Sequence, residues 1–231
     1  MNSLANIAES FVSLLYPYAC VCCNRTLTYY EKHICRYCFS NLSRTHFDKL
    51  EMNPVMELLM GRVPLKKANA FLIFNRRNST RKILHELKYR ENPEMGYFMG
   101  RQYTSEAPSI LNDIDAILPV PLHKSKLKKR GYNQSEEFAN GLAFEKPVPV
   151  LNDTAERIKQ SVSQTKKGKL ERIKTLQDAF SVNETVNSFQ PVLIVDDVIT
   201  TGSTLETLAS KVLEQKPDLQ LSFASIAYAQ H

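Results

Sequence analysis

Two adjacent carboxylates, Asp196 and Asp197, follow a run of apolar, mostly β-branched residues and precede a stretch rich in Thr, Ser and Gly. The run at residues 192–195 predicts a buried strand, and a helix should follow at residues 203–214. Backbone N–H groups, hydroxyls and the helix dipole at such a turn favour a phosphate. The carboxylates cannot bind phosphate but can accept hydrogen bonds from sugar hydroxyls. A well-capped strand–helix connection is the simpler alternative, but it leaves the two acids unexplained. The predicted phosphate cradle is Thr200, Thr201, Gly202, Ser203 and Thr204.

Five cations stand within seven residues, directly after a predicted strand at residues 115–120: Lys124, Lys126, Lys128, Lys129 and Arg130. A basic loop here could neutralise a diphosphate or contact the phosphates of a nucleic acid. A solvated run of charge is the alternative on composition alone. The Arg-Gly-Tyr-Asn-Gln sequence that ends the run argues against charge kept only for solubility. The candidate anion-binding residues are Lys124, Lys128, Lys129, Arg130, Gly131, Asn133 and Gln134.

All five cysteines lie between Cys20 and Cys38. Two CxxC pairs, separated by eleven residues, can form a tetrahedral thiolate site that favours structural zinc. Cys22 is left over; its pairing with Cys20 is an alternative, although a spacing of one residue makes a poorer knuckle. His33 is also close, but a fully thiolate site needs no imidazole. A chance cluster of free thiols is disfavoured by the paired spacing. The predicted ligands are Cys20, Cys23, Cys35 and Cys38.

The elements that must position these groups alternate along the chain. Strands are also predicted at residues 70–74, 147–151 and 219–227, and further helices begin near Ser79, after Pro93 and at residues 134–143. A loop is expected at residues 154–168 and a short helix at residues 170–178. This alternation predicts an α/β fold: a mainly parallel sheet with flanking helices and ligands at the carboxyl ends of its strands.

The chain of 231 residues suits one core domain, at residues 51–231, plus a small appendage at residues 1–50. The appendage would hold an amphipathic helix at residues 1–16, the cysteine cluster and a short helix at residues 39–44. Residues 1–16 lack the basic start and cleavage site of a signal peptide. No apolar run approaches the ~20 residues that span a bilayer. We therefore expect a cytoplasmic protein without membrane insertion; its net charge of +6 is only a mild hint of polyanionic partners.

Residues 192–204 resemble the phosphoribosyl diphosphate-binding motif of type I phosphoribosyltransferases. The resemblance implies that Asp196 and Asp197 hold ribose hydroxyls, that residues 200–204 hold the 5′-phosphate, and that magnesium is bound with the diphosphate. Thr200 stands where purine-salvage members often place an Asp suspected as general base. Because a Thr hydroxyl cannot serve as a base near neutral pH, proton abstraction from a purine is not supported, and no catalytic residue is identified.

A third polar segment completes a wider resemblance. Arg157, Gln164 and Arg172 would lie in a flexible loop, and they follow the cysteine pairs and the basic run in the order typical of the ComF family. Members of that family are linked to natural competence and DNA utilisation and carry an N-terminal four-cysteine module. The resemblance covers most of the chain and implies single-stranded DNA and a helicase of the competence machinery as partners. Thr175 departs from the family pattern, which commonly has Asn there.

Two function classes follow. One is a magnesium-dependent phosphoribosyltransferase, whose acceptor the sequence does not identify. The other is a non-catalytic module that binds single-stranded DNA or an uptake partner. An enzyme of this type needs a hood over the reacting base, and the hood must come from the first ~70 residues. Tyr29, Tyr30 and Phe39 are candidates for stacking on that base, although they could equally pack around the zinc.

Overall fold

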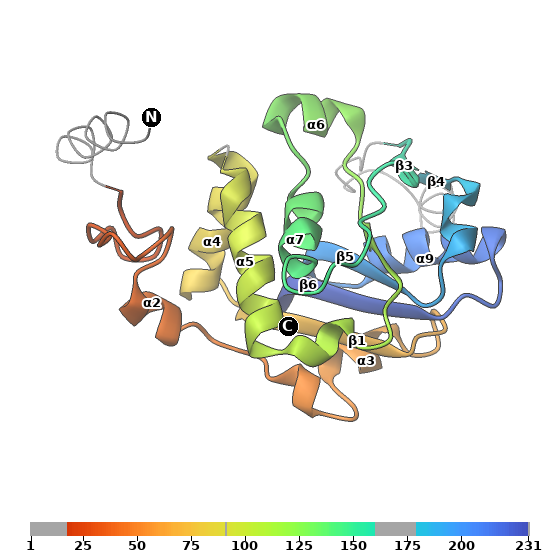
Figure 1. Cartoon of the computed structure of the whole chain (residues 1–231), viewed down its shortest axis with the longest axis horizontal. Coiled ribbons are helices and arrows are strands. Elements are labelled where there is room, and N and C mark those ends of the chain that lie inside the picture. Colours follow the sequence, from red (N-terminus) through yellow and green to blue (C-terminus); the bar gives the residue numbers. More distant parts are fainter. Residues whose placement is uncertain (1–17, 91, 160–178, 231) are drawn as a thin grey trace.

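A four-stranded parallel sheet forms the centre of the computed structural model, which describes residues 18–90, 92–159 and 179–230. The sheet order is β1-β6-β5-β2 (Figure 1). Its strands are β1 (Lys67–Phe74), β2 (Ala116–Pro119), β5 (Val192–Ile199) and β6 (Leu221–Ala229). Because parallel neighbours point the same way, the carboxyl ends of all four strands lie at one edge. The predicted α/β fold is confirmed.

Helices cover both faces of this sheet. Side chains alternate along β5, so that Leu193 and Val195 join one core cluster while Val192 and Ile194 join the other. The first cluster is completed by α4 (Ser79–Tyr89), α5 (Pro93–Glu106) and α7 (Gln134–Leu142). The second is completed by α3 (Pro54–Leu59) and α9 (Ser203–Gln215). The strand that carries the two acids is therefore buried on both sides, which makes its carboxyl end a rigid platform.

Shorter elements connect these layers. A two-stranded antiparallel sheet pairs β3 (Ala155–Arg157) with β4 (Phe180–Val182). The remaining helices among the described residues are α2 (Arg36–Ser40), η1 (Phe47–Lys49), η2 (Pro108–Leu111), α6 (Lys124–Arg130) and η3 (Glu184–Ser188). Within the described ranges no helix combines the length and the apolar character needed to cross a membrane.

Three local expectations need correction. The basic segment is the helix α6 and not a loop, and β3 occupies part of the expected loop at residues 154–168. Residues 147–151 form only a single bridge, from Val150 to Ile117, because Pro147 and Pro149 have no N–H to donate to a ladder. The expected helices at residues 1–16 and 170–178 lie outside the described residues.

The first segment of the described chain packs against α4 and α5 (Figure 1). Phe39 contacts Phe98 of α5, with their ring centroids 5.9 Å apart, and the Lys82 ammonium donates to the Cys22 carbonyl. The predicted domain boundary near residue 50 stays a prediction. We call residues 18–41, which hold all five cysteines, the cysteine module.

Candidate functional site

The predicted phosphate cradle forms a tight turn between β5 and α9. Gly202 caps α9 with a φ of +74°, a left-handed conformation that favours glycine, and the Thr201 and Ser203 hydroxyls lie 2.9 Å apart. A Cβ on Gly202 would lie 2.8 Å from a methyl group of the buried Leu59. The sequence accounts for this glycine by close approach to a phosphate. In the structure its backbone conformation and the contact with α3 also require it.

Arg62 holds this turn from outside and was not identified from the sequence. Its guanidinium donates to the Thr201 carbonyl at 2.6 Å and pairs with Glu206 on the first turn of α9. The contact joins residues 139 positions apart in the chain. Such a restraint leaves the backbone N–H groups of the turn preorganised before any ligand arrives.

The acid pair lies within β5, next to three protein hydrogen-bond donors. The Ser135 hydroxyl and the backbone N–H of Asp197 donate to Asp196 Oδ1 at 3.0 and 2.8 Å. Lys88 Nζ lies 2.9 Å from Asp197 Oδ2. Burial, and then the charge of Asp197, raise the pKa of Asp196 to about 7. Asp196 keeps some exposed surface, so a ligand can reach it, but the surrounding protein makes its negative charge costly.

Four cations from three separate elements, α4, α6 and β3, gather around this pair. Burial lowers the pKa of Lys126, and the positive charges of Arg157, Arg130 and Lys88 lower it further. Burial also lowers the pKa of Arg157, whereas the negative charge of Asp196 raises it. The Arg157 Nε is buried without a hydrogen-bond partner. Like charges held together above buried carboxylates are stabilised by an anionic ligand. The structure thus brings Arg157 to the predicted ribose site and adds Lys88 and Ser135, which sequence reasoning missed.

Helix α6 projects from the body of the molecule as an arm (Figure 1). The His123 side chain caps its first turn by accepting from Ser125 N–H at 3.2 Å, and Gly131 ends it in the left-handed conformation. Lys124 pairs with Glu156 at 2.8 Å. Lys128 and Lys129 are exposed in the last turn, where positive charge also complements the helix dipole. The tip of the arm therefore offers two exposed ammonium groups to solvent.

The amide side chains that follow the arm are buried and hold it in place. Asn133 donates to the Val120 carbonyl at 3.1 Å and caps α7, while Gln134 donates to the Leu87 carbonyl at 3.1 Å. Arg130 donates to Gln134 Oε1 at 2.9 Å. These contacts position the arm beside the carboxyl-terminal end of α4. Contact of Asn133 and Gln134 with a phosphate stays a prediction. The other predicted loop residues, Gln164 and Arg172, lie outside the described part of the chain.

Four thiols converge in the cysteine module. The Sγ atoms of Cys20, Cys23, Cys35 and Cys38 all lie within 4.8 Å of one another, as the spacing predicts. Burial opposes ionisation of Cys20, but backbone N–H groups of Cys35, Cys23 and Cys22 outweigh it and lower its pKa to about 6. Burial and the neighbouring sulfurs raise the pKa of Cys38. A divalent cation would let all four thiols ionise, so this cluster could bind a structural metal such as zinc.

The remaining candidates of the module take other places. Cys22 is buried, and a hydrogen bond with Ser79 directs it towards α4; burial raises its pKa to about 11. His33 Nε2 lies 3.6 Å from a Glu94 carboxylate oxygen, outside the thiol cluster. Tyr29 and Tyr30 are 94% and 92% exposed, so they do not pack around the metal site.

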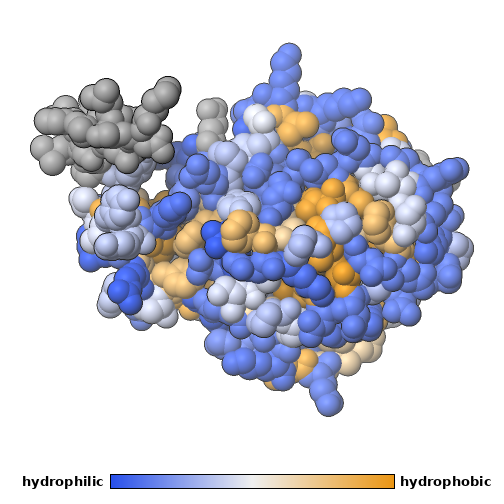
Figure 2. Space-filling view, viewed as in Figure 1, coloured by the Kyte–Doolittle hydropathy of each residue, from blue (hydrophilic) through white to orange (hydrophobic). Residues whose placement is uncertain are grey.

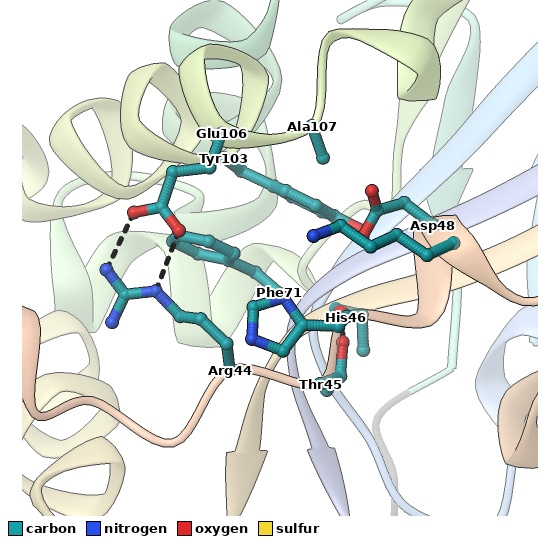
Figure 3. A pocket seen from close by; sticks show the side chains of 10 residues that line it. Arg44, Thr45, His46, Asp48, Phe71, Tyr103, Glu106 and Ala107 are labelled. Carbon is teal, nitrogen blue, oxygen red and sulfur yellow. Dashed lines mark hydrogen bonds and ion pairs between the residues drawn. The ribbon is translucent and has the colours of Figure 1, made fainter.

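A pocket of about 190 Å³ lies away from the acid pair, where the chain passes from the cysteine module to the sheet (Figure 3). The bidentate pair of Arg44 with Glu106 borders it, with oxygen–nitrogen distances of 2.9 and 2.7 Å. Phe71 and Tyr103 stack beside it with centroids 4.8 Å apart. None of the predicted site residues lines this pocket, so it is distinct from the candidate ligand site.

No protein-family model matches the chain. Competence protein F of Haemophilus influenzae is 39% identical over 103 residues, which cover 44% of each protein. DNA utilization protein YhgH of Salmonella typhimurium is 29% identical over 136 residues, 57% of this chain and 60% of the relative. The matched segments thus span about half the length of these two relatives. Competence protein ComFC of Bacillus subtilis is 24% identical over 197 residues, 85% of this chain and 78% of that protein.

The similarity is not confined to the segment with the acid pair, since the alignment with ComFC covers 85% of this chain. Their names fall into one group of competence and DNA-utilisation proteins. Together with the α/β fold and the four-cysteine cluster, these homologues support membership of the chain in the ComF family.

Proposed function

We propose that this chain binds phosphoribosyl diphosphate at the carboxyl edge of its sheet and acts in DNA uptake or processing. One observation carries the ligand: two adjacent carboxylates on β5 lead into the turn before α9 and face cations from other elements. A sugar phosphate presents hydroxyls and an anion side by side, so it matches both halves of this arrangement. The names of the relatives support the role with DNA.

Each group has a task in this proposal. Asp196 and Asp197 would accept hydrogen bonds from the ribose hydroxyls, and the backbone N–H groups at Gly202 and Ser203 would hold the 5′-phosphate. Lys126 and Arg157 would neutralise the diphosphate, and magnesium would enter with that diphosphate. Lys88 would have to share Asp197 with the ribose. Arg62 keeps the turn in place and need not touch the ligand.

Transfer of the ribosyl group would need an acceptor at the anomeric carbon. The Thr200 hydroxyl on the turn is not a base near neutral pH, so it would not take a proton from that acceptor. The exposed Lys128 and Lys129 favour a second candidate function, non-catalytic binding of single-stranded DNA. In that case the phosphoribosyl site would bind its ligand without turnover.

Thermal shift measurements test the ligand. Phosphoribosyl diphosphate with magnesium should raise the melting temperature of the wild-type chain, and the Asp196→Ala/Asp197→Ala variant should lose that rise. Asp113→Ala/Asp218→Ala is a matched control, because it removes two carboxylates at the opposite, amino edge of the sheet. A rise that persists in the Asp196/Asp197 variant, or its absence from the wild type, contradicts the proposed site. Release of diphosphate from the bound ligand distinguishes transfer from binding alone.

A further inference from the structure

The cysteine module exposes aromatic rings. Tyr18, Tyr29, Tyr30 and Tyr37 are 78%, 94%, 92% and 74% exposed, although all lie within twenty residues of one another. A single exposed aromatic residue needs no explanation, but a group of them on one small module marks a contact surface. Figure 2 shows a pale surface of intermediate hydropathy over the module, at the left of the molecule.

The turn that carries two of these rings is held by hydrogen bonds to the Glu31 carboxylate. The Glu31 carboxylate accepts from the backbone N–H of Thr28 at 2.9 Å, from that of Arg36 at 2.8 Å and from the Arg25 guanidinium at 2.7 Å. The Glu31 side chain is only 4% exposed. Tyr29 and Tyr30 above it stand edge to face, with centroids 5.4 Å apart and planes at 87°. A rigid turn that presents two nearly fully exposed rings loses little conformational entropy when a partner stacks on them.

We propose that Tyr29 and Tyr30, assisted by Tyr37, form a stacking surface for the bases of single-stranded DNA. This inference rests on the proposed role with DNA and adds the place of contact. Lys32 and Arg36 are exposed beside the rings in the sequence, so cations for the phosphates accompany faces for the bases. Aromatic stacking with flanking positive charge is the general solution for sequence-tolerant binding of single strands, because every base has a π face.

The position of the cysteine module on the domain allows a DNA strand bound to the module to continue along the protein surface. The Arg44 guanidinium lies 4.5 Å from the Phe39 ring centroid and 5.1 Å from that of Phe71, and it pairs with Glu106 (Figure 3). In Figure 1, α4 and α5 lie between the module and the arm α6. Tyr89, at the end of α4, is 65% exposed with the Arg130 guanidinium 5.9 Å from its ring. A DNA strand stacked on the module would therefore meet another exposed ring, that of Tyr89, and then the basic arm, whose Arg130 lies beside that ring.

Fluorescence anisotropy with a labelled oligo-dT strand and the full, metal-loaded chain tests this surface. Tyr29→Ala/Tyr30→Ala should weaken binding about 10-fold or more, as expected for the loss of two stacking rings. Tyr29→Phe/Tyr30→Phe should bind like the wild type, because the π faces remain. Phe144→Ala, which removes an exposed ring elsewhere, is the matched control. The salt dependence of binding should be unchanged in the alanine variant, since no phosphate contact is lost.

The outcomes separate this inference from the proposed function. A wild-type chain that does not bind oligo-dT contradicts the role with DNA itself. If the alanine variant keeps wild-type affinity, metal content and melting temperature, the proposed stacking surface is wrong, although the role with DNA can stand. The exposed tyrosines would then be assigned to contact with a protein partner. An equal loss in the phenylalanine variant, or a reduced salt dependence, also overturns it, because hydroxyl or phosphate contacts would then carry the binding.

Discussion

The cysteine module and the carboxyl edge of the sheet gather reactive groups in opposite ways. In the module, four thiols from one short segment point inward and lie within 4.8 Å of one another. At the sheet edge, carboxylates on β5 and cations on α4, α6 and β3 face each other across a site that keeps partial exposure. Around a bound metal ion, the first set would leave no open coordination position for a substrate. In the second set the positive and negative charges compensate one another only in part, and the groups stay accessible to a ligand.

The contrast assigns different physical roles to the two regions. A closed thiolate cluster that binds a metal would contribute folding free energy to a segment too small to bury a core of its own. An open charged site costs stability, because buried like charges repel one another until a ligand compensates them. Substitutions in the module should therefore change structure first, and substitutions at the sheet edge should change ligand binding or pH dependence first.

The largest effect is expected in the module. Cys35→Ser should lose most of the bound zinc, from about one ion per chain, because three thiolates cannot close the tetrahedron. Structural zinc contributes on the order of 10 kcal/mol to small zinc modules, so the module should unfold and become sensitive to proteases. Elemental analysis and limited proteolysis measure both changes. Cys22→Ser should keep its metal; equal metal loss in the two variants would contradict the assignment of the four ligands.

A smaller effect should follow from a methyl group at the phosphate turn. Gly202→Ala places a Cβ at a φ of +74° and 2.8 Å from Leu59, whereas Gly61→Ala meets a φ of +75° with no atom within 4 Å. We expect a destabilisation of about 1 kcal/mol for Gly61→Ala and about 2 kcal/mol for Gly202→Ala. Chemical denaturation compares the two. Equal losses would show that Leu59 does not restrain the turn, and the sheet edge would be less preorganised than its contacts indicate.

The open site should also show itself in the pH dependence of stability. The pKa of Asp196 is raised from 3.8 to about 7, so the folded chain binds a proton more tightly than the unfolded chain. The free energy of unfolding should therefore fall as the pH rises from about 4 to 7 and level off above that. Asp196→Asn should remove this fall and be more stable than the wild type at pH 8 by at least about 1 kcal/mol, which corresponds to a melting temperature higher by at least about 2 °C. If the melting temperatures of the two proteins change with pH in the same way between pH 5 and 8, the charge of Asp196 is not costly.

The smallest effect is expected at the arm. Lys128→Gln/Lys129→Gln should weaken oligo-dT binding several-fold and lower the slope of log K against log salt by about 1.4, since each lost phosphate contact accounts for about 0.7 with a single strand. Lys66→Gln/Lys211→Gln makes the same change in net charge at pairs remote from the arm. If both variants change the slope equally, the effect comes from net charge, and the arm does not contact the DNA phosphates specifically.

Much of the fold and of both sites could be predicted because the patterns that carry them are local. A β-branched run, two acids, a glycine turn and an amphipathic stretch make one continuous strand–turn–helix, and the structure retains that order. The cysteine ligands are likewise set by spacing within nineteen residues. Proline explains the one predicted strand that is missing, since residues 147–151 contain two positions without an N–H.

Only the tertiary structure decided what surrounds those local patterns. Lys88, Ser135 and Arg62 reach the acid pair or its turn from elements far away in the chain, with sequence separations of 61 for Ser135 and Asp196 and 139 for Arg62 and Thr201. Likewise, the sequence could not tell that the Asn133 and Gln134 amides are buried supports of the arm, or that Tyr29 and Tyr30 face solvent. The physical reason is the same in each case. Spacing along the chain specifies a strand, a turn or a knuckle, but the partners and the exposure of a side chain depend on which distant elements pack beside it.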